Sequence, residues 1–341
     1  MPTYLAPGRV NVIGEHTDHA GGLALAMAID RGITLDVTGG GDRHRLTSSR
    51  FGDLDLALDE EPTAGWGRYV AAVAHELRDA GVPTTGLEGR LSSDLPAGAG
   101  LSSSGALEVV VARALLDGAE RTLDDETLIR ACRDAEERAV GVPCGLLDQA
   151  TIVLGRPGHV VFLSFADLGY ERIPWPADLT IVVAHSGITR RLEDSPYAER
   201  RRELLAGLAG SLDPAALRRV RHLRSENERV REVVAILRRP RPDARAIGRA
   251  MLAGHASLRD DFEVSTPELD RLVESAVEHG AYGARLTGAG FGGSIVALTD
   301  TAAAPGIRDR ILADSTVWAP DRSAQAWIVR PSGGASRMPA G

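Results

Sequence analysis

A loop rich in glycine and serine, set between a strand-like segment and a helical pattern, constrains this chain more than any other feature. The segment SDLPAGAGLSSSGALEVVVARALL begins at Ser93, and its apolar residues from Leu107 onward recur at helical spacing. Glycines let a backbone approach a ligand closely, and the free amides at a helix start point toward an anion. The sequence therefore predicts strand, loop and helix in that order, with an anion site where they meet.

Three consecutive hydroxyls, Ser102, Ser103 and Ser104, indicate which anion this loop holds. A single serine at a helix start would act as a cap, and a single glycine would make a turn. Three hydroxyls after flexible glycines exceed what capping requires, so a phosphate is favoured, with the hydroxyls as donors or as a magnesium ligand. The loop does not follow G-x-G-x-x-G, which argues against a dinucleotide site.

The chain contains no lysine: all 39 of its Lys and Arg residues are arginine. A phosphate loop of the G-K-[ST] type, a protein kinase and a Schiff-base enzyme each require an amine, so the sequence excludes these classes. A bound phosphate must instead be held by backbone amides, hydroxyls, arginine or a metal ion.

The opening stretch GRVNVIGEHTDHAGG, which begins at Gly8, concentrates polar side chains. Glu15, His16 and Asp18 are suited to a polyol, because short carboxylates accept hydroxyl donors and discriminate strongly between sugars. A metal site is the alternative, since E-H-x-D-H offers both hard and borderline ligands. The two histidines are three residues apart rather than the helical four, which favours the polyol.

A carboxylate, Asp148, follows two leucines in CGLLDQ and is either a helix cap or a functional acid. Transfer of a phosphoryl group to a hydroxyl needs a carboxylate near an arginine and compensation of the transferred charge. Arg9 and Asp148 are the candidates for these two roles. A second glycine loop, Gly288 to Gly293, is either an ordinary hairpin or a backbone that a ligand or the first loop approaches closely.

The alternation of strand and helix patterns predicts an α+β protein with two domains, residues 1–165 and 166–330. HVVFLSF and LTIVVAHS are the strand candidates expected to open the second domain, which continues with long helices between residues 196 and 280. The tail, residues 331–341, is expected to be disordered because it is rich in glycine, serine and proline.

Composition limits the partners. A net charge of −8 argues against nucleic acid and anionic membranes, and the arginine-rich segment from Leu217 to Arg245 matches a solvated helix face. Two cysteines cannot build a disulfide framework, no apolar run reaches about 18 residues, and the N-terminus lacks a signal-peptide pattern. A cytoplasmic protein, monomeric or weakly oligomeric, is expected.

Taken together, these segments resemble the three motifs of the GHMP small-molecule kinases, and RVNVIGEHTDH resembles the galactokinase signature. The similarity extends through CGLLDQ, SPYAERRREL, RHLRSENERV and HASLRDDFEVSTPELD. The resemblance implies the two-domain GHMP fold, with a mixed sheet in the N-terminal domain, an antiparallel sheet with helices in the C-terminal domain, and the active site between them. It also implies that ATP with Mg²⁺ phosphorylates the anomeric hydroxyl of galactose, giving α-D-galactose 1-phosphate and ADP.

The resemblance also implies residue roles. Asp148 and Arg9 match the catalytic pair, and whether the aspartate is a base or a stabiliser of the transition state stays open. The implied magnesium ligands are Ser104 and Glu136. The implied sugar contacts are Glu15, His16, Asp18, Gly145 and Tyr197, and the implied phosphate loop comprises Pro96, Gly98, Ala99, Gly100, Leu101, Ser102, Ser103 and Ser104.

Two positions of the signature depart from the family. His19 and Ala20 stand where the family usually has Tyr and often Asn. A protonated imidazole at the rim of a sugar pocket attracts a carboxylate, so a preference for an oxidised or differently substituted sugar is the alternative to galactose. The alternatives to galactose are galacturonate, arabinose and N-acetylgalactosamine, and a further alternative is a galactose and ATP sensor without catalysis.

Overall fold

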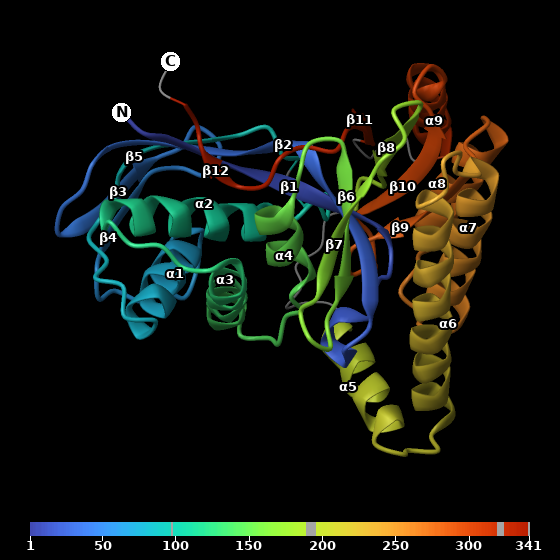
Figure 1. Ribbon diagram of the computed structural model, residues 1–341, viewed down its shortest axis with the longest axis horizontal. Helices are drawn as coiled ribbons and strands as arrows, with labels where there is room; N and C mark the ends of the chain where they lie inside the picture. Colours follow the sequence, from blue (N-terminus) through green and yellow to red (C-terminus); the bar gives the residue numbers. More distant parts are fainter. Residues whose placement is uncertain (97, 189–195, 319–323, 340–341) are drawn as a thin grey trace.

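The computed structural model describes residues 1–96, 98–188, 196–318 and 324–339, and the described strands form two sheets (Figure 1). The first sheet has the order β12-β1-β2-β5-β3-β4, with β6 pairing β2 and β7 pairing β6. Its β3–β5 pair is parallel and its other pairs are antiparallel, so the sheet is mixed. The second sheet, in the order β11-β8-β10-β9, is antiparallel throughout.

The strands have these bounds: β1 Thr3–Ile13, β2 Leu23–Gly39, β3 Arg43–Thr47, β4 Leu54–Ala57, β5 Glu88–Ser93, β6 His159–Ser164, β7 Tyr170–Pro174, β8 Leu179–His185, β9 Gly283–Thr287, β10 Ser294–Asp300, β11 Gln325–Val329 and β12 Ser336–Arg337. The helices are a short 3-10 turn at Asp18–Ala20, then α1 Gly67–Asp79, α2 Ser103–Gly118, α3 Asp125–Val140, α4 Leu147–Leu154, α5 Tyr197–Leu208, α6 Pro214–Leu237, α7 Ala244–Asp260, α8 Pro267–Glu278 and α9 Ala304–Trp318.

Helices α1 to α4 cover one face of the first sheet, and α6, α7 and α8 stand side by side next to β9 (Figure 1). The apolar run LALAMAI at the start of β2 is almost entirely buried, which is the pattern of a strand covered on both faces. The arginine-rich segment forms most of α6, whose Val220, Leu223 and Val230 pack into the core. This segment is therefore a packed helix with a charged outer face, as its spacing indicates.

Several helices begin where short polar side chains cap them. Asp124, Asp213, Asp243 and Thr266 each accept a hydrogen bond from a backbone amide of the following turn, at the starts of α3, α6, α7 and α8. These caps satisfy amides that a helix start leaves without partners. The start of α2 is different, because Ser102 makes no such bond.

The chain passes from the first sheet to the second between Pro174 and Leu179, whereas the predicted domain boundary lies at residue 165. HVVFLSF contributes β6 to the first sheet, where it pairs with β2, and β7 pairs with β6. A boundary at residue 165 would separate two hydrogen-bonded strands. The sequence also gave no signal for β1, whose Pro7 and Gly8 lie at a register shift and whose burial is nearly continuous.

The prediction of a disordered tail is wrong for residues 331–339, and residues 340–341 lie outside the described part. After β11 the chain returns to the first sheet, where Pro331 bridges Ile29 and β12 pairs with β1. Ala335 donates a backbone hydrogen bond to Ile152 at 2.8 Å. The composition misled because this polar segment is held by backbone hydrogen bonds together with the side chains of Ser332 and Arg337.

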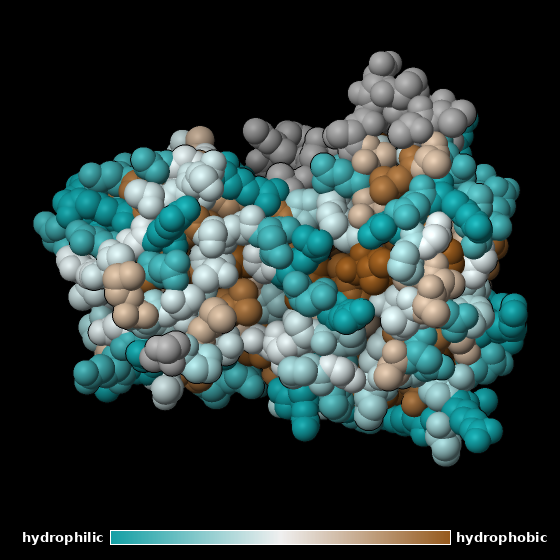
Figure 2. Space-filling model, turned by 90° about the horizontal axis from the view of Figure 1, so that it is seen from above, coloured by the Kyte–Doolittle hydropathy of each residue, from teal (hydrophilic) through white to brown (hydrophobic). Residues whose placement is uncertain are grey.

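Seen from above, the surface is largely polar, with apolar residues gathered in a hollow toward the middle of this face (Figure 2). Among the described helices, none combines the length and the apolar character needed to cross a membrane.

Candidate active site

The glycine-serine loop joins β5 to α2 in a strained conformation. Gly98, Gly100 and Ser102 have φ angles of 67°, 73° and 58°, in the left-handed region that disfavours side chains. The Ser102 hydroxyl donates to the carboxylate of Asp148 instead of capping α2. The Ser104 hydroxyl donates to Glu136 at 2.7 Å. The hydroxyls therefore face carboxylates of α3 and α4, which is not the arrangement of a capping serine.

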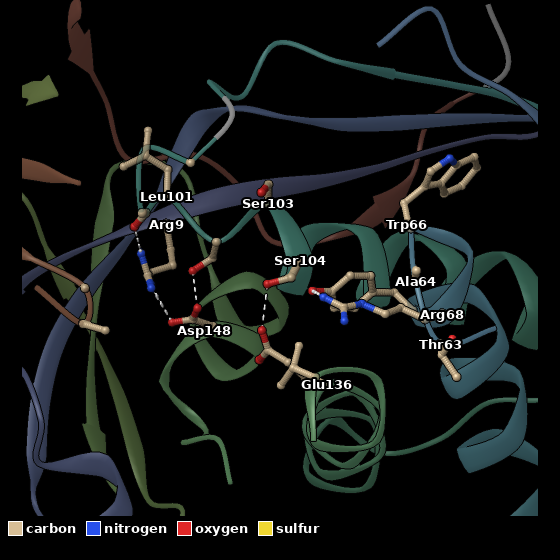
Figure 3. A pocket seen from close by; sticks show the side chains of 18 residues that line it. Arg9, Thr63, Ala64, Trp66, Arg68, Leu101, Ser103, Ser104, Glu136 and Asp148 are labelled. Carbon is tan, nitrogen blue, oxygen red and sulfur yellow. Dashed lines mark hydrogen bonds and ion pairs between the residues drawn. The ribbon is translucent and has the colours of Figure 1, made fainter. Parts of the chain in front are cut away.

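A cavity of about 580 Å³ opens beside this loop, a size typical of small-molecule sites. Trp66 and Arg68 lie at its opposite end from Arg9 and Asp148 (Figure 3). Of the predicted loop residues, those that line it are Gly98, Gly100, Leu101, Ser102, Ser103 and Ser104. Pro96 and Ala99 do not, and the Ala99 carbonyl instead accepts a hydrogen bond from Ser294 at 2.6 Å, which ties the loop to the second sheet.

Arg9, on β1, and Asp148, in the first turn of α4, form an ion pair across 139 positions of sequence. The Nε and Nη2 atoms of Arg9 lie 2.7 and 2.6 Å from Oδ1 of Asp148, and Nη1 donates to the carbonyl of Gly100 at 2.6 Å. Arg9 is only 5% exposed. One guanidinium thus holds the acid and the glycine loop together (Figure 3).

A second, smaller cavity adjoins the first. Its lining includes all five predicted sugar contacts: Glu15, His16, Asp18, Gly145 and Tyr197. The two cavities share Arg9, Glu136, Asp148, Gly288 and Ala289. The ion pair of Arg9 and Asp148 therefore lies at the junction of the two cavities.

His19 does not face this smaller cavity, contrary to the expectation of an imidazole at its rim. Its side chain is 1% exposed, and its Nδ1 lies 3.2 Å from Oδ1 of Asp18. Burial alone would raise the pKa of Asp18, but the hydrogen bonds and charge of His19, together with the charge of His16, outweigh burial and lower this pKa. His19, at the position where the family usually has tyrosine, therefore contacts Asp18 and does not line the smaller cavity.

Glu15 is held by residues that the sequence did not identify as part of the site. Nη2 of Arg285, on β9, lies 2.7 Å from Oε2 of Glu15 and 2.6 Å from Oε1 of Glu226, on α6. Burial raises the pKa of Glu15 to about 7, although Arg285 opposes this shift. Burial also works to raise the pKa of Glu226, but the charge of Arg285 prevails and lowers it to about 2. An arginine inside the otherwise apolar strand ARLT is the signal that could have found this cluster.

Glu136 and its neighbours form a buried set of oxygen ligands. The amide of Gln149 donates to Glu136 and to Glu108, at 2.8 Å in each case. Burial raises the pKa of Glu136, and the charge of Asp148 adds to this shift. The Glu136 carboxylate and the Ser104 hydroxyl together provide two hard oxygen ligands of the kind that Mg²⁺ prefers.

Among the described residues, the His, Cys, Asp and Glu side chains close enough together to share a metal ion are His75, Glu76 and Asp79. They lie on α1 and line neither cavity, and the opening stretch contributes no such group.

The second glycine loop joins β9 to β10 and also meets the first loop. Thr287 lies near Gly100, and Gly288 and Ala289 line both cavities.

Comparisons with known proteins agree with this geometry. Residues 68–156 match the GHMP kinases N terminal domain, residues 233–314 match the GHMP kinases C terminal domain, and residues 3–38 match the galactokinase galactose-binding signature. The galactokinase of Pyrococcus furiosus is 38% identical over 97% of this chain and 98% of its own length. The galactokinase of Roseiflexus sp. is also 38% identical, over 98% of this chain and 92% of its own.

The crystal structure of Lactococcus lactis galactokinase complexed with galactose superposes with a TM-score of 0.91 at 28% identity, covering 99% of this chain and 95% of the other. The two-domain fold that the resemblance implied, with one mixed and one antiparallel sheet, is confirmed. Sequence identity along nearly the whole chain, the signature at its start and the matching fold together show that this chain belongs to the galactokinase family of GHMP kinases.

Proposed function

We propose that this chain transfers the γ-phosphoryl group of ATP to the anomeric hydroxyl of galactose, giving α-D-galactose 1-phosphate and ADP. One observation carries the proposal: the cavity beside the glycine-serine loop and the cavity beside Glu15 and Asp18 meet at Arg9 and Asp148. A donor in the first cavity and an acceptor in the second would have their reacting groups at this junction.

The larger cavity suits a nucleoside triphosphate. Backbone amides at the start of α2 and the hydroxyls of Ser103 and Ser104 would hold the phosphates without any lysine. Trp66, at the far end (Figure 3), and Tyr69, which also lines the cavity, offer flat faces against which a base can pack.

Asp148 would accept the proton of the sugar hydroxyl. Its Oδ1 contacts Arg9, and its Oδ2 receives the hydroxyl of Ser102. In phosphoryl transfer the protein mainly positions the reactants and offsets developing charge, and Arg9 supplies a fixed positive charge at the transfer point. Asp148 and Arg9 therefore act as a unit.

Ser104 and Glu136 would hold Mg²⁺, because a hydroxyl and a carboxylate at 2.7 Å from each other line the nucleotide side of the junction. When bound, the ion would neutralise charge on the phosphates.

Galactose is favoured over galacturonate by the charges around the smaller cavity. A uronic acid needs a cation to meet its carboxylate, but Arg9 is already paired with Asp148, Glu15 and Asp18 add negative charge to the lining, and His19 does not line the cavity. A silent sensor is disfavoured because the loop, Arg9 and Asp148 are assembled. The cytoplasmic location and the monomeric or weakly oligomeric state remain predictions.

A coupled assay of ADP release across a sugar panel tests the proposal. Galactose, galacturonate, arabinose and N-acetylgalactosamine would each be titrated at saturating ATP and Mg²⁺. The highest kcat/KM is expected for galactose. A preference for the uronic acid would reject galactose as the substrate, and sugar and ATP binding without turnover would identify a sensor.

Asp148→Asn tests the assigned acid. The amide cannot accept the hydroxyl proton as a base, so kcat is expected to fall about 10³-fold, within the usual range for loss of a general base. ATP binding, measured by calorimetry, should be retained. Asp134→Asn is the control: Asp134 is a partly exposed residue of α3 that lines neither cavity, and its substitution should leave kcat unchanged. Near-normal turnover of the Asp148 variant would remove its role.

A further inference from the structure

A cluster of four alternating charges continues inward from the smaller cavity. It runs from Glu15 to Arg285 at 2.7 Å, from Arg285 to Glu226 at 2.6 Å, and from Glu226 to Arg229 at 2.8 Å. Arg285 and Glu226 are 0% exposed and Glu15 is 1% exposed. Charges buried to this degree are costly unless each one is paired, so the cluster holds its members in a fixed arrangement.

The surrounding backbone is shaped to accept this cluster. A Cβ atom at Gly254, on α7, would lie 2.3 Å from Nη1 of Arg285, so a side chain there would displace the guanidinium. Glu226 also accepts a hydrogen bond from the amide of Gly14 at 2.7 Å. The ring of His222 lies 3.1 Å from the carbonyl oxygen of Glu15. Residues of α6 and β9 therefore fix both the backbone and the side chain at Glu15.

The Glu15 carboxylate has an ion pair but no well-formed hydrogen bond. Its Oε2 lies 2.7 Å from Nη2 of Arg285, and both of its oxygens are buried without a hydrogen-bond partner among the described residues. Glu15 lines the smaller cavity, and Arg285 lines neither cavity. A buried carboxylate oxygen without a partner is unfavourable, and a hydroxyl of a bound ligand would satisfy it.

We propose that Arg285 is a positioning residue for the sugar: it engages one oxygen of Glu15 and leaves the other available to a sugar hydroxyl, while Glu226, itself paired with Arg229, balances the charge of Arg285. This inference rests on the proposed function, since it takes the smaller cavity as the sugar site. Arg285 acts through Glu15 and touches no substrate.

The proposal differs from a purely structural ion pair in how sugar binding depends on pH. The groups that face Glu15 are Arg285 from β9, Glu226 from α6 and Arg9 from β1. Arg285 and Arg9 lower the pKa of Glu15, and Glu226 raises it. Removing Arg285 should therefore move the acid limb of sugar binding to higher pH, and removing the charge of Glu226 should move it to lower pH.

The test compares the wild-type enzyme with Arg285→Gln and Glu226→Gln. The galactose KM and kcat would be measured from pH 6 to 9 at saturating ATP and Mg²⁺, with thermal unfolding of each variant. Wild-type galactose KM should fall as pH rises through about 7, where Glu15 ionises. At pH 7, Arg285→Gln is expected to raise this KM about 10- to 100-fold, with partial recovery at higher pH, and to leave the ATP KM within about twofold.

Arg219→Gln is the matched control. Arg219 is also buried, 1% exposed, and pairs with Glu203 at 2.8 Å, but it contacts neither Glu15 nor either cavity. It should lower the melting temperature and leave the pH dependence of the galactose KM unchanged.

Each outcome is decisive. An unchanged galactose KM profile in Arg285→Gln overturns the inference while leaving galactose phosphorylation intact. If Arg285→Gln does not fold, Glu226→Gln is the deciding variant. The inference is overturned if the pH dependence of the galactose KM does not move to lower pH in Glu226→Gln. If the wild-type enzyme does not phosphorylate galactose, the proposed function fails by itself, and the same pH series is then run with the sugar that is phosphorylated.

Discussion

Gly145 shapes the smaller cavity by lacking a side chain. A Cβ atom at this position would lie 1.5 Å from Oδ2 of Asp18, which is far inside the contact distance. Asp18 is itself held from behind by His19. The aspartate has little freedom to yield, so the glycine and the carboxylate fit as a pair.

Gly145→Ala is expected to raise the galactose KM on the order of 10²-fold, because the added methyl group displaces Asp18 by about an ångström or more. The ATP KM should stay near the wild-type value. Gly118→Ala is the control: this last residue of α2 has open space around its Cβ position and should change neither KM. A galactose KM within twofold of wild type in the Gly145 variant would contradict this account.

Two elements approach at backbone distance where α7 meets β9. A Cβ atom at Gly248 would lie 2.0 Å from the carbonyl oxygen of Tyr282, and one at Gly283 would lie 2.1 Å from the carbonyl of Gly248. Arg285 lies on β9 and pairs with Glu15, so the close packing of α7 against β9 also determines the position of the Arg285 guanidinium.

Gly248→Ala is expected to lower the free energy of unfolding by about 1–3 kcal/mol, since the methyl group forces α7 away from β9 and the gain in helix propensity offsets only part of the cost. Gly306→Ala, in α9 with no atom near its Cβ position, should instead be neutral or stabilising by up to about 1 kcal/mol. Chemical denaturation of both variants measures the contrast, and equal effects would refute it.

The contact between β3 and the start of β5 contains a pH-sensitive histidine. His44 is 1% exposed, and its Nδ1 accepts a hydrogen bond from the amide of Leu87 at 3.3 Å. Burial, with a smaller contribution from the charge of Arg78, lowers the pKa of His44 to about 4. The folded protein therefore keeps this ring neutral at pH values where the unfolded chain protonates it.

Because the lowered pKa favours proton uptake by the unfolded state, His44 reduces stability as pH falls from about 6.5 toward 4. Between pH 7 and pH 5, the wild-type protein should lose on the order of 2 kcal/mol more stability than His44→Gln, which has no proton to take up. Urea titrations at the two pH values give this difference. Parallel losses in both proteins would show that His44 is not responsible.

At the scale of the whole molecule, the end of the chain closes the first sheet. Residues 331–338 cross from the second sheet and attach by backbone hydrogen bonds to three separate regions of the N-terminal half. The donors and acceptors are Ser332 to Ala28, Gly334 to Gly155, Ala335 to Ile152 and Met338 to Thr3, each at 2.8 Å. Residues 331–338 thus connect β2, α4 and β1 through backbone hydrogen bonds.

Truncation after Arg330 removes these four backbone bonds, the pairing of β12 with β1 and the side-chain bonds of Ser332 and Arg337, and it leaves the edge of β1 open. At about 1 kcal/mol for each bond, a loss of at least roughly 4 kcal/mol is expected, together with a greater tendency to aggregate through the exposed edge. Deleting only residues 339–341 leaves all four bonds in place and should be neutral. Denaturant titration compares the two, and equal stability would show that the returning segment contributes nothing.

The sequence alone determined the local features of this protein. The glycines at positions 98 and 100 permit the positive φ angles of the loop, the spacing from Leu107 specifies α2, and the opening motif carries Glu15 and Asp18 on one short segment. These features can be predicted because backbone sterics and helical periodicity act over a few residues, and because the motif types are recognisable as a kinase family.

Only the tertiary structure decided which distant groups meet. Arg9 contacts Asp148 because β1 packs against α4. Arg285 contacts Glu15 because Gly248 and Gly254 allow α7 to approach closely. The same packing turned His19 away from the cavity and recruited residues 331–338 into the first sheet. Which remote segments come into contact depends on how side chains fill the whole core, and this cannot be read from the spacing of residues along the chain.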